Sequence, residues 1–429
     1  MKTLPFRSAL FFFAIILCMG CQAGYGQNVP DTVAGIPVNY NQLVLEDYTL
    51  PELLTTEEGE RIETAAQWMD IRRDEILDLY RTYQYGSAPE PPGQLHFEVF
   101  DEGTEVFGGK AVRKQVRIYL TREEQGPKMD LVVYLPENDP GPSPVLLYLS
   151  FVANSMTIDD PGIRRGEIWG REQRRVPAPE ESPFGNMDIE PFIDSGIGFA
   201  SVYYGDIEPD FAEGIRYGIR SAYLEQEEEL PGDHWGAICA WAWGLSRAVD
   251  YFETDPDVDE ERIAILGASR LGKTVLWAGA RDQRFAAVIA SCSGEGGAAL
   301  SRREYGETIA HLTAPSRYPY QFCPNYSNYG HRVDEFPVDA HMLISLMAPR
   351  PLLLQTGDTD YWSDPLGEYM SAVEAGRVYR LFGEDAPGYP VPPAGKALYS
   401  TLGYFMHSGG HGFVPADFDV FIRFLKKHL

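Results

Sequence analysis

Ser269 lies in a glycine-flanked turn, GASRLGK, between a strand pattern and a helix pattern. The apolar run at 261–267 predicts a strand, and residues 271–281 predict a helix. A tight strand–turn–helix exposes a serine hydroxyl above the sheet and aims free helix N–H groups at a developing oxyanion. The usual pattern is G-x-S-x-G, whereas here Leu271 holds the second glycine position and Gly272 follows. The segment therefore indicates a nucleophilic serine, with an ordinary helix N-cap serine as the alternative.

Candidate partners for this serine follow two later strand patterns. The segments DTDYWSDP and HSGGHGF offer Asp358, Asp360, Asp364, His407 and His411. The chain order of serine, acid and histidine is typical of α/β-hydrolases. In them the histidine takes the serine proton and returns it to the leaving alcohol, while the carboxylate stabilises the imidazolium. We expect His411, in the glycine-rich loop, to be the base, and His407 to have a packing role.

The elements that position these groups alternate between strand and helix patterns from residue 142 onward. Strands are predicted at 142–151, 197–205, 261–267, 285–293, 348–357 and 402–410, and helices at 234–253, 271–281, 368–376 and 417–429. Further upstream, the chain predicts a helix over 55–86, antiparallel strands at 96–103, 110–121 and 129–137, and a long surface loop at 159–185. The alternation predicts an α/β-hydrolase fold, a three-layer sandwich with a mostly parallel central sheet. We expect a single catalytic domain over 46–429, after a linker at 24–45.

Longer stretches of the chain carry a more specific pattern. They are GASRLGK, SGEGGAALSRREYGE, PVDAHMLISLMAPRPLLL, DYWSDPLGE and GGHG, with QWMDIRRDEILDLYRTYQYG, VYYGDIEPD and AWAWGLSRAVDYFETDPDVD upstream. Together they resemble the glucuronoyl esterase family, carbohydrate esterase family fifteen, from Val44 to the C-terminus. In that family the displaced glycine of G-x-S-R-x-G-K is the usual form. The resemblance implies an enzyme without cofactor or metal ion that cleaves esters between (4-O-methyl-)glucuronic acid on glucuronoxylan and lignin alcohols.

The resemblance assigns the reacting groups. Ser269 is the implied nucleophile and His411 the implied general base. Arg270 is implied to contribute its side chain and its backbone N–H to the oxyanion hole. A guanidinium at that position suits a charge that develops only in the tetrahedral state.

The resemblance also assigns three groups to the sugar. Lys273 lies one helical turn beyond Ser269 and so can face the same cleft. This lysine and Glu307, in REYGE, are implied to bind the uronate hydroxyls. Trp362 is implied to line the sugar pocket. Without the flanking motifs, a solvated lysine and a core tryptophan would be the simpler interpretations.

The triad acid is the point at which the chain departs from many relatives. They carry a glutamate where this chain has Cys292, and a thiol cannot replace a carboxylate at neutral pH. Other bacterial relatives carry the acid after the next strand, in D-x-W, a pattern that Asp360 fits. We therefore assign Asp360, with Glu295 as the competitor and Asp358 as a weaker one.

Charge and cysteine content limit the function classes. The 429-residue chain has 36 basic and 63 acidic residues and a formal net charge of −27. Such a chain repels phosphate backbones and anionic lipid, so we expect no nucleic-acid partner. An esterified uronate carries no carboxylate charge and is compatible with this acidic body. Cys239, Cys292 and Cys323 are too few for a disulfide scaffold and leave at most one bridge open. We expect a monomer.

The N-terminus predicts export. Lys2 and Arg7 precede an apolar run too short to span a bilayer comfortably, which is typical of a secretory signal over 1–23. Cys21 resembles a lipoprotein cleavage site, and ordinary cleavage after Ala23 is the alternative. The expected location is the periplasm, the outer membrane through a lipid anchor at Cys21, or the medium.

Two other functions remain open at this point. An acetyl esterase of the acetylxylan type would use the same scaffold and differ around the sugar-binding groups rather than in the triad. A non-catalytic glycan-binding lipoprotein would use a retired hydrolase fold. The cysteine at position 292 favours the latter, whereas the retained Ser269, Asp360 and His411 argue against it.

Overall fold

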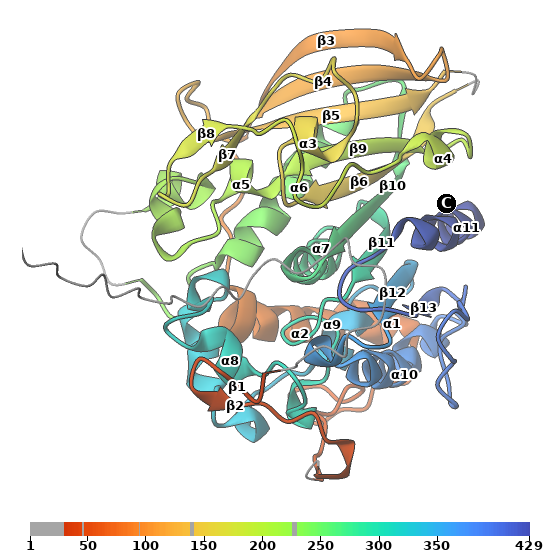
Figure 1. The fold of residues 1–429 in the computed structure, drawn as a ribbon. Helices are drawn as coiled ribbons and strands as arrows, with labels where there is room; N and C mark the ends of the chain where they lie inside the picture. Colours follow the sequence, from red (N-terminus) through yellow and green to blue (C-terminus); the bar gives the residue numbers. More distant parts are fainter. Residues whose placement is uncertain (1–29, 45–46, 94, 138–140, 225–229) are drawn as a thin grey trace, which may run out of the picture.

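Nine strands form the central sheet of the computed structural model, which describes residues 30–44, 47–93, 95–137, 141–224 and 230–429. They are β3 (His96–Val106), β4 (Ala111–Tyr119), β5 (Lys128–Pro136), β6 (Ser143–Ser150), β9 (Gly198–Tyr203), β10 (Val258–Ala268), β11 (Phe285–Ser291), β12 (Leu352–Gly357) and β13 (Leu402–His407). Their order is β13-β12-β11-β10-β6-β9-β5-β4-β3 (Figure 1). Strands β6 and β9 to β13 run parallel, and β5, β4 and β3 extend the sheet antiparallel. Each predicted strand is present.

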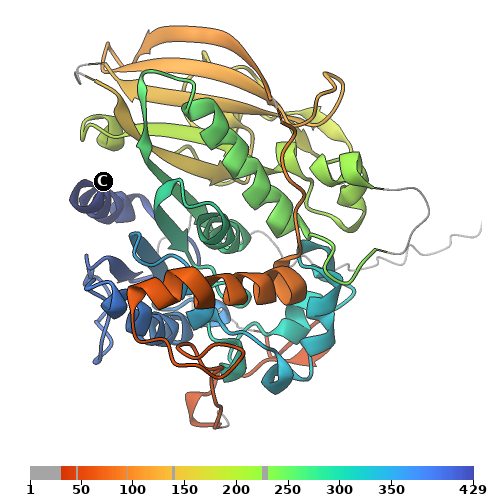
Figure 2. The ribbon, with the colours of Figure 1, turned by 180° about the vertical axis from the view of Figure 1, so that it is seen from behind.

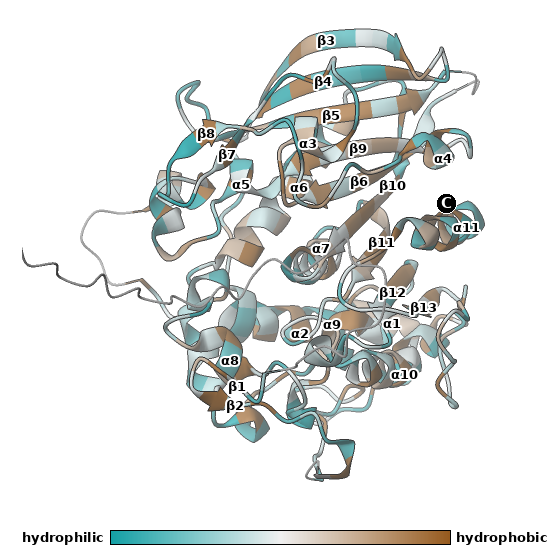
Figure 3. Cartoon of the chain, in the orientation of Figure 1, coloured by the Kyte–Doolittle hydropathy of each residue, from teal (hydrophilic) through white to brown (hydrophobic). Residues whose placement is uncertain are grey.

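The strand sequences explain their places in the sheet. Strands β6, β9 and β12 are buried along their whole length, as continuous apolar runs in a parallel sheet should be. The edge strand β3 is mostly exposed or half-buried and carries many acidic residues, which discourage pairing with another chain. Figure 3 shows this contrast as brown central strands and a mixed teal and brown β3.

Helices cover both faces of the sheet. One face packs against α2 (Arg73–Tyr80), α6 (Ala237–Phe252), α7 (Arg270–Arg281), α9 (Ala340–Ser345) and α10 (Pro365–Leu381), several of which face the viewer in Figure 2. The other face packs against α4 (Glu190–Ile193) and α11 (Phe418–His428). Neighbouring strand residues alternate between the two cores, as Leu147 and Leu146 do. The predicted three-layer sandwich with a mostly parallel sheet is confirmed.

The N-terminal helix is shorter than the helix predicted over 55–86. It runs from α1 (Ala65–Gln67) through α2 to Tyr85, with π-helical turns before and after α2. Thr64 has extended backbone, and its hydroxyl accepts a hydrogen bond from the Gln67 N–H at 3.2 Å. The Gln67 side chain accepts the Thr64 N–H in return, which completes a capping box. The helix therefore begins after Thr64, and Thr55 instead pairs with Arg61 in a bridged turn.

The segment predicted as a long surface loop, 159–185, contains a small hairpin. Its strands are β7 (Glu167–Trp169) and β8 (Arg175–Pro177), closed by the Gly170 N–H, which donates to the Arg174 carbonyl at 2.8 Å. The Trp169 indole donates to the carbonyl of Gly205 at 2.8 Å and fixes the hairpin to the body of the protein. The sequence lacks a two-residue hairpin signal here, because five residues separate the paired ends of the strands, Trp169 and Arg175.

Several expectations concern termini and thiols. The predicted signal over 1–23 and the lipid anchor at Cys21 lie outside the described residues. Within the described residues, none of the helices combines the length and the apolar character needed to cross a bilayer. Cys239, Cys292 and Cys323 are buried free thiols, so none of them bridges another.

Candidate active site

Ser269 occupies a strained turn at the carboxyl end of β10. Its φ of 58° and ψ of −127° lie outside the regions that non-glycine residues favour, and helix α7 begins at the next residue. Two backbone hydrogen bonds hold this conformation. The Ser269 N–H donates to the Ser291 carbonyl at 2.8 Å, and the Lys273 N–H donates to the Ser269 carbonyl at 3.1 Å. The geometry is that of a nucleophile turn rather than of an ordinary helix cap, whose side chain would accept a backbone N–H.

Close packing explains the displaced glycine of GASRLGK. A Cβ atom at Gly267 would lie 2.3 Å from the Leu271 carbonyl oxygen, and one at Gly272 would lie 2.7 Å from the Ser291 carbonyl oxygen. Leu271 is fully buried in the core. The start of α7 thus approaches the end of β11 most closely at residue 272, and it is there that the fold requires a glycine.

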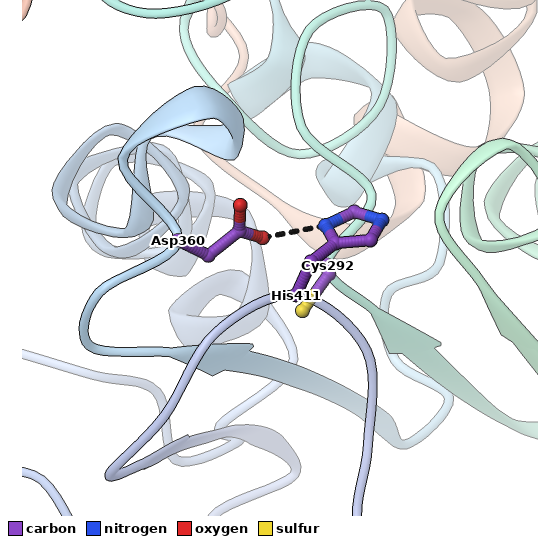
Figure 4. Close-up of side chains that lie close together, drawn as sticks. All are labelled: Cys292, Asp360 and His411. Carbon is purple, nitrogen blue, oxygen red and sulfur yellow. Dashed lines mark hydrogen bonds and ion pairs between the residues drawn. The ribbon is translucent and has the colours of Figure 1, made fainter. Parts of the chain in front are cut away.

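His411 and Asp360 meet above two neighbouring parallel strands, β13 and β12. The Nδ1 atom of His411 lies 2.7 Å from an Asp360 carboxylate oxygen (Figure 4). The Ser363 hydroxyl lies 3.2 Å from the same nitrogen. Asp360 is buried, which acts to raise its pKa, but the charge and hydrogen bond of His411 hold the pKa of Asp360 below its usual value. Asp360 is therefore ionised at neutral pH, as the partner of a catalytic histidine must be.

Glu295, the competing acid, lies elsewhere. Its carboxyl group accepts hydrogen bonds from the Ser301 hydroxyl at 2.6 Å and the Tyr326 hydroxyl at 3.0 Å. Burial raises the pKa of Glu295 to about 8, so this carboxyl is largely protonated at neutral pH. A neutral, engaged carboxyl is poorly suited to stabilise an imidazolium. The assignment of Asp360 stays a prediction about catalysis, and the hydrogen-bond geometry favours it.

Cys292 fills the position where many relatives carry the acid. Its backbone is left-handed, with φ of 44°, and its thiol donates to the Gly412 carbonyl and accepts the Gly412 N–H at 3.2 Å. The ligand atoms of Cys292, Asp360 and His411 lie within 4.8 Å of one another, which resembles a metal-binding cluster. Burial, together with the nearby carboxylates, raises the pKa of Cys292 well above its usual value. A thiol kept protonated in this way is a poor metal ligand and instead supports the loop that carries His411.

The remaining candidates from the sequence have structural partners. Asp358 accepts the Gly409 N–H at 2.8 Å, and Asp364 pairs with Arg303 at 2.7 Å and caps helix α10. His407 contacts Asp417 through Nδ1 at 2.8 Å. These residues shape the loops above β12 and β13.

The Arg270 guanidinium is held by a residue that sequence reasoning missed. It forms a short ion pair with Asp210 and lies over the Tyr318 ring, 4.7 Å from its centroid. Asp210 also accepts hydrogen bonds from Tyr320 at 3.0 Å and Gln321 at 2.7 Å. Arg270 thus lies at the start of α7 with its charge compensated and its position fixed. VYYGDIEPD was part of the family pattern, but nothing in its spacing links Asp210 to a residue 60 positions later.

Lys273, Glu307 and Trp362 lie together. The Lys273 ammonium is 3.9 Å from the Glu307 carboxylate, both side chains are more than nine-tenths buried, and burial lowers the pKa of Lys273. The Glu307 N–H donates to the Trp362 carbonyl at 2.9 Å, and the Arg317 guanidinium contacts Glu307 at 3.1 Å. Arg317 also lies 5.8 Å from the centroid of the Trp362 ring, and no sequence motif pointed to this residue.

An apolar cavity opens beside the nucleophile. It has a volume of about 190 Å³, and Ser269 and His411 both line it. Aromatic side chains form part of its wall, with Phe151, Phe184 and Phe413 among them. The serine and the histidine therefore line the same mainly apolar cavity, which can hold an uncharged group next to them.

A nucleophile turn, a histidine–carboxylate pair above neighbouring parallel strands, and a three-layer sandwich are the marks of an α/β-hydrolase. The family model described as "Glucuronyl esterase, fungi" matches residues 230–383. The carbohydrate esterase MZ0003, from an unknown prokaryotic organism, is 41% identical over 91% of this chain and 92% of its own length.

Solved structures of glucuronoyl esterases are also similar to this protein. The glucuronoyl esterase from Solibacter usitatus superposes with a TM-score of 0.86 at 41% identity, covering 90% of this chain and 99% of that one. A structure described as a promiscuous CE15 esterase from the marine bacterial metagenome superposes with a TM-score of 0.84 at 41% identity. The match covers 91% of this chain and 100% of that one. The chain belongs to the glucuronoyl esterase family, carbohydrate esterase family fifteen, and is a carboxylic ester hydrolase. The non-catalytic alternative is therefore set aside.

The close approach at Gly272 predicts a cost for any side chain there. Gly272→Ala should lower the free energy of unfolding by about 1–3 kcal/mol, because the added methyl must push α7 away from the end of β11. Urea denaturation measures this change. Gly388→Ala is the matched control, since a Cβ there meets no atom within 4 Å. Equal stability of the two variants would contradict the packing explanation.

The two carboxyl groups make opposite predictions for catalysis. Asp360→Asn should reduce kcat by about 10³–10⁴-fold, because the imidazolium loses its charged partner. Glu295→Gln should stay within about tenfold of the wild type, because its carboxyl is already largely neutral and a glutamine can still accept from its neighbours. Steady-state kinetics on a glucuronate ester compares them. A larger loss in Glu295→Gln than in Asp360→Asn would refute the assignment.

Proposed function

We propose that this esterase hydrolyses esters of (4-O-methyl-)glucuronic acid on glucuronoxylan, with lignin alcohols as leaving groups, through a Ser-His-Asp acyl-enzyme. The 2.7 Å hydrogen bond between Asp360 and His411 carries the proposal. It fixes the imidazole tautomer with a proton on Nδ1, so that Nε2 is the nitrogen able to act as a base. The wall of a single cavity contains both that imidazole and Ser269.

The reaction proceeds in two halves. In the first, Ser269 Oγ attacks the ester carbonyl carbon while His411 takes the hydroxyl proton; the collapsing tetrahedral intermediate releases the alcohol, which receives that proton. In the second, His411 takes a proton from water, the resulting hydroxide attacks the acyl-enzyme, and the released Ser269 Oγ recovers a proton as glucuronate leaves. The backbone N–H and guanidinium of Arg270 stabilise the oxyanion in both halves.

The acyl half of the substrate belongs beside Lys273, Glu307 and Trp362. A buried ammonium and a buried carboxylate 3.9 Å apart can donate to and accept from adjacent sugar hydroxyls, and each is costly to leave without a partner. The Trp362 ring offers an apolar face to the pyranose. Names of fungal relatives, 4-O-methyl-glucuronoyl methylesterases at 25–26% identity over 78% of this chain, support a uronate as the acyl group.

The alcohol half fits the apolar cavity. Because the leaving oxygen must lie near His411, the group attached to it extends along the wall that contains Phe151, Phe184 and Phe413. Aromatic walls favour an aromatic alcohol. An acetyl esterase is the second candidate, and the description of one relative as promiscuous favours testing it.

Export and anchoring complete the proposal. A polymeric substrate cannot enter the cytoplasm, and Lys2 and Arg7 before an apolar run support export to the periplasm, the outer membrane or the medium. Cys21 would carry the lipid if the protein is anchored.

Substrate comparison tests the acyl group. Purified protein should hydrolyse benzyl glucuronate with a kcat/KM at least about tenfold above that for an acetylated xylose, because only the uronate satisfies Lys273 and Glu307. Ser269→Ala should abolish both activities. Release of glucuronic acid and of acetate is followed by chromatography, and activity confined to the acetyl substrate would sink the proposal.

A truncation tests the alcohol side in the same assay. Phe184→Ala should raise KM for benzyl glucuronate about tenfold, through lost aromatic contact, and leave methyl glucuronate within about twofold. Equal effects on the two esters would place the alcohol outside this cavity.

A further inference from the structure

A second, larger cavity of about 930 Å³ forms a groove on the surface of the protein, lined with cations. The turn between β4 and β5, the hairpin β7–β8 and residues 216–223 border it. Seven basic and four acidic side chains line it, whereas the whole chain has 36 basic and 63 acidic residues. The groove thus reverses the charge balance of the protein, and a concave surface with a net positive charge concentrates anionic ligands.

Only some of these cations are neutralised. Arg117 forms a bidentate pair with Asp130, at 2.7 and 2.9 Å, and Arg175 pairs with Asp206 at 2.6 Å. By contrast, no ion pair or hydrogen bond joins the exposed side chain of Arg122 or of Arg216 to any part of the chain that the structure describes. The groove therefore holds arginines that can bind an outside anion.

Other groove arginines are anchored and still present N–H groups. Arg165 donates only its Nε to a described atom, the Ala178 carbonyl at 2.7 Å. The Arg164 guanidinium stacks on Phe100, 3.4 Å from the ring centroid, which fixes its plane. Guanidinium groups held in this way match the geometry of carboxylates with little further loss of side-chain entropy.

Exposed aromatic rings lie among the cations. Tyr217 is 52% exposed and Tyr223 is 37% exposed, and both line the groove. Tyr217 is held by contacts with Trp169 at 5.5 Å and Phe211 at 6.0 Å between ring centroids. Partly exposed aromatic rings suit the flat faces of sugar rings, and nearby arginines suit their carboxylates.

The groove adjoins the active site. Phe151 and Val152 line the cavity beside Ser269, while the next two residues, Ala153 and Asn154, line the groove. Figure 1 shows α3 (Asn154–Thr157), β7, β8 and α5 (Tyr204–Ile207) gathered on this side of the sheet. A polymer held in the groove therefore stays beside the nucleophile.

From these observations we infer that the groove is a second binding site for a carboxylate-bearing polysaccharide, which engages unesterified uronates along the chain whose ester is cleaved. The identity of the polymer rests on the proposed function. Sparse carboxylates on a neutral backbone contact the cations of the groove without bringing a continuous negative charge against a protein of net charge −27. A nucleic acid, with a charge on every residue, would meet that repulsion along its length.

The test measures binding without turnover. Wild-type protein is titrated at low ionic strength with de-esterified glucuronoxylan, and with the same xylan after its carboxyl groups have been reduced to alcohols. We expect binding to the first polymer, loss of most of that binding on reduction, and weakening by salt. Arg122→Ala/Arg216→Ala should weaken binding to the acidic polymer at least about tenfold, since two charge-assisted contacts are removed.

The matched control is Arg423→Ala/Lys426→Ala, which removes two exposed cations from α11, a helix that does not line the groove. It should stay within about twofold of the wild type, and thermal unfolding checks that both double variants are folded. Equal weakening by the two double variants, equal binding of the reduced polymer, or tighter binding of duplex DNA would each overturn the inference. Because no ester is cleaved in this assay, failure of the proposed esterase specificity is read separately, from the benzyl glucuronate assay.

Discussion

The hydrogen bond between Asp360 and His411 is the contact on which the rest of the site depends. It joins the loops that follow β12 and β13, whose register pairs Gly357 with His407 at the ends of the strands. The loops are tied again just beyond, where the Thr359 N–H donates to the Gly409 carbonyl at 3.0 Å. A Cβ atom at Gly357 would lie 2.1 Å from the Gly410 carbonyl oxygen, so the two loops come together at a glycine. The sheet thus sets the distance between His411 and Asp360.

The nucleophile is positioned by a second, independent contact in the same sheet. Strained backbone at Ser269 persists because the end of β11 accepts its N–H and the start of α7 presses against that same strand end at Gly272. The carboxylate that contacts His411 follows β12, and the residue directly after β11 is Cys292. Cys292 occupies that place as a buried thiol hydrogen-bonded to Gly412, next to His411. The thiol therefore supports the histidine loop without carrying charge.

Local patterns in the sequence were sufficient for much of this account. Continuous apolar runs predicted the parallel strands, and the chain order of Ser269, Asp360 and His411 predicted which loops meet. The predicted start of the N-terminal helix was wrong. Acidic residues after Thr55 suggested that the helix begins there, whereas the capping box lies at Thr64. Contacts between distant residues gave no local signal. The Arg270–Asp210 pair spans 60 positions. The cationic groove is assembled from segments far apart in the sequence, between Pro92 and Tyr223, and its excess of basic residues cannot be seen in the acidic overall composition.

The most direct test of the account is the Nδ1 proton resonance of His411 in protein labelled with nitrogen-15 histidine, identified by its loss in His411→Ala. A proton shared with a buried carboxylate resonates far downfield of an ordinary imidazole proton. We expect Glu295→Gln to leave this resonance in place and Asp360→Asn to remove it or move it upfield. Loss of the resonance in Glu295→Gln with its retention in Asp360→Asn would contradict the account.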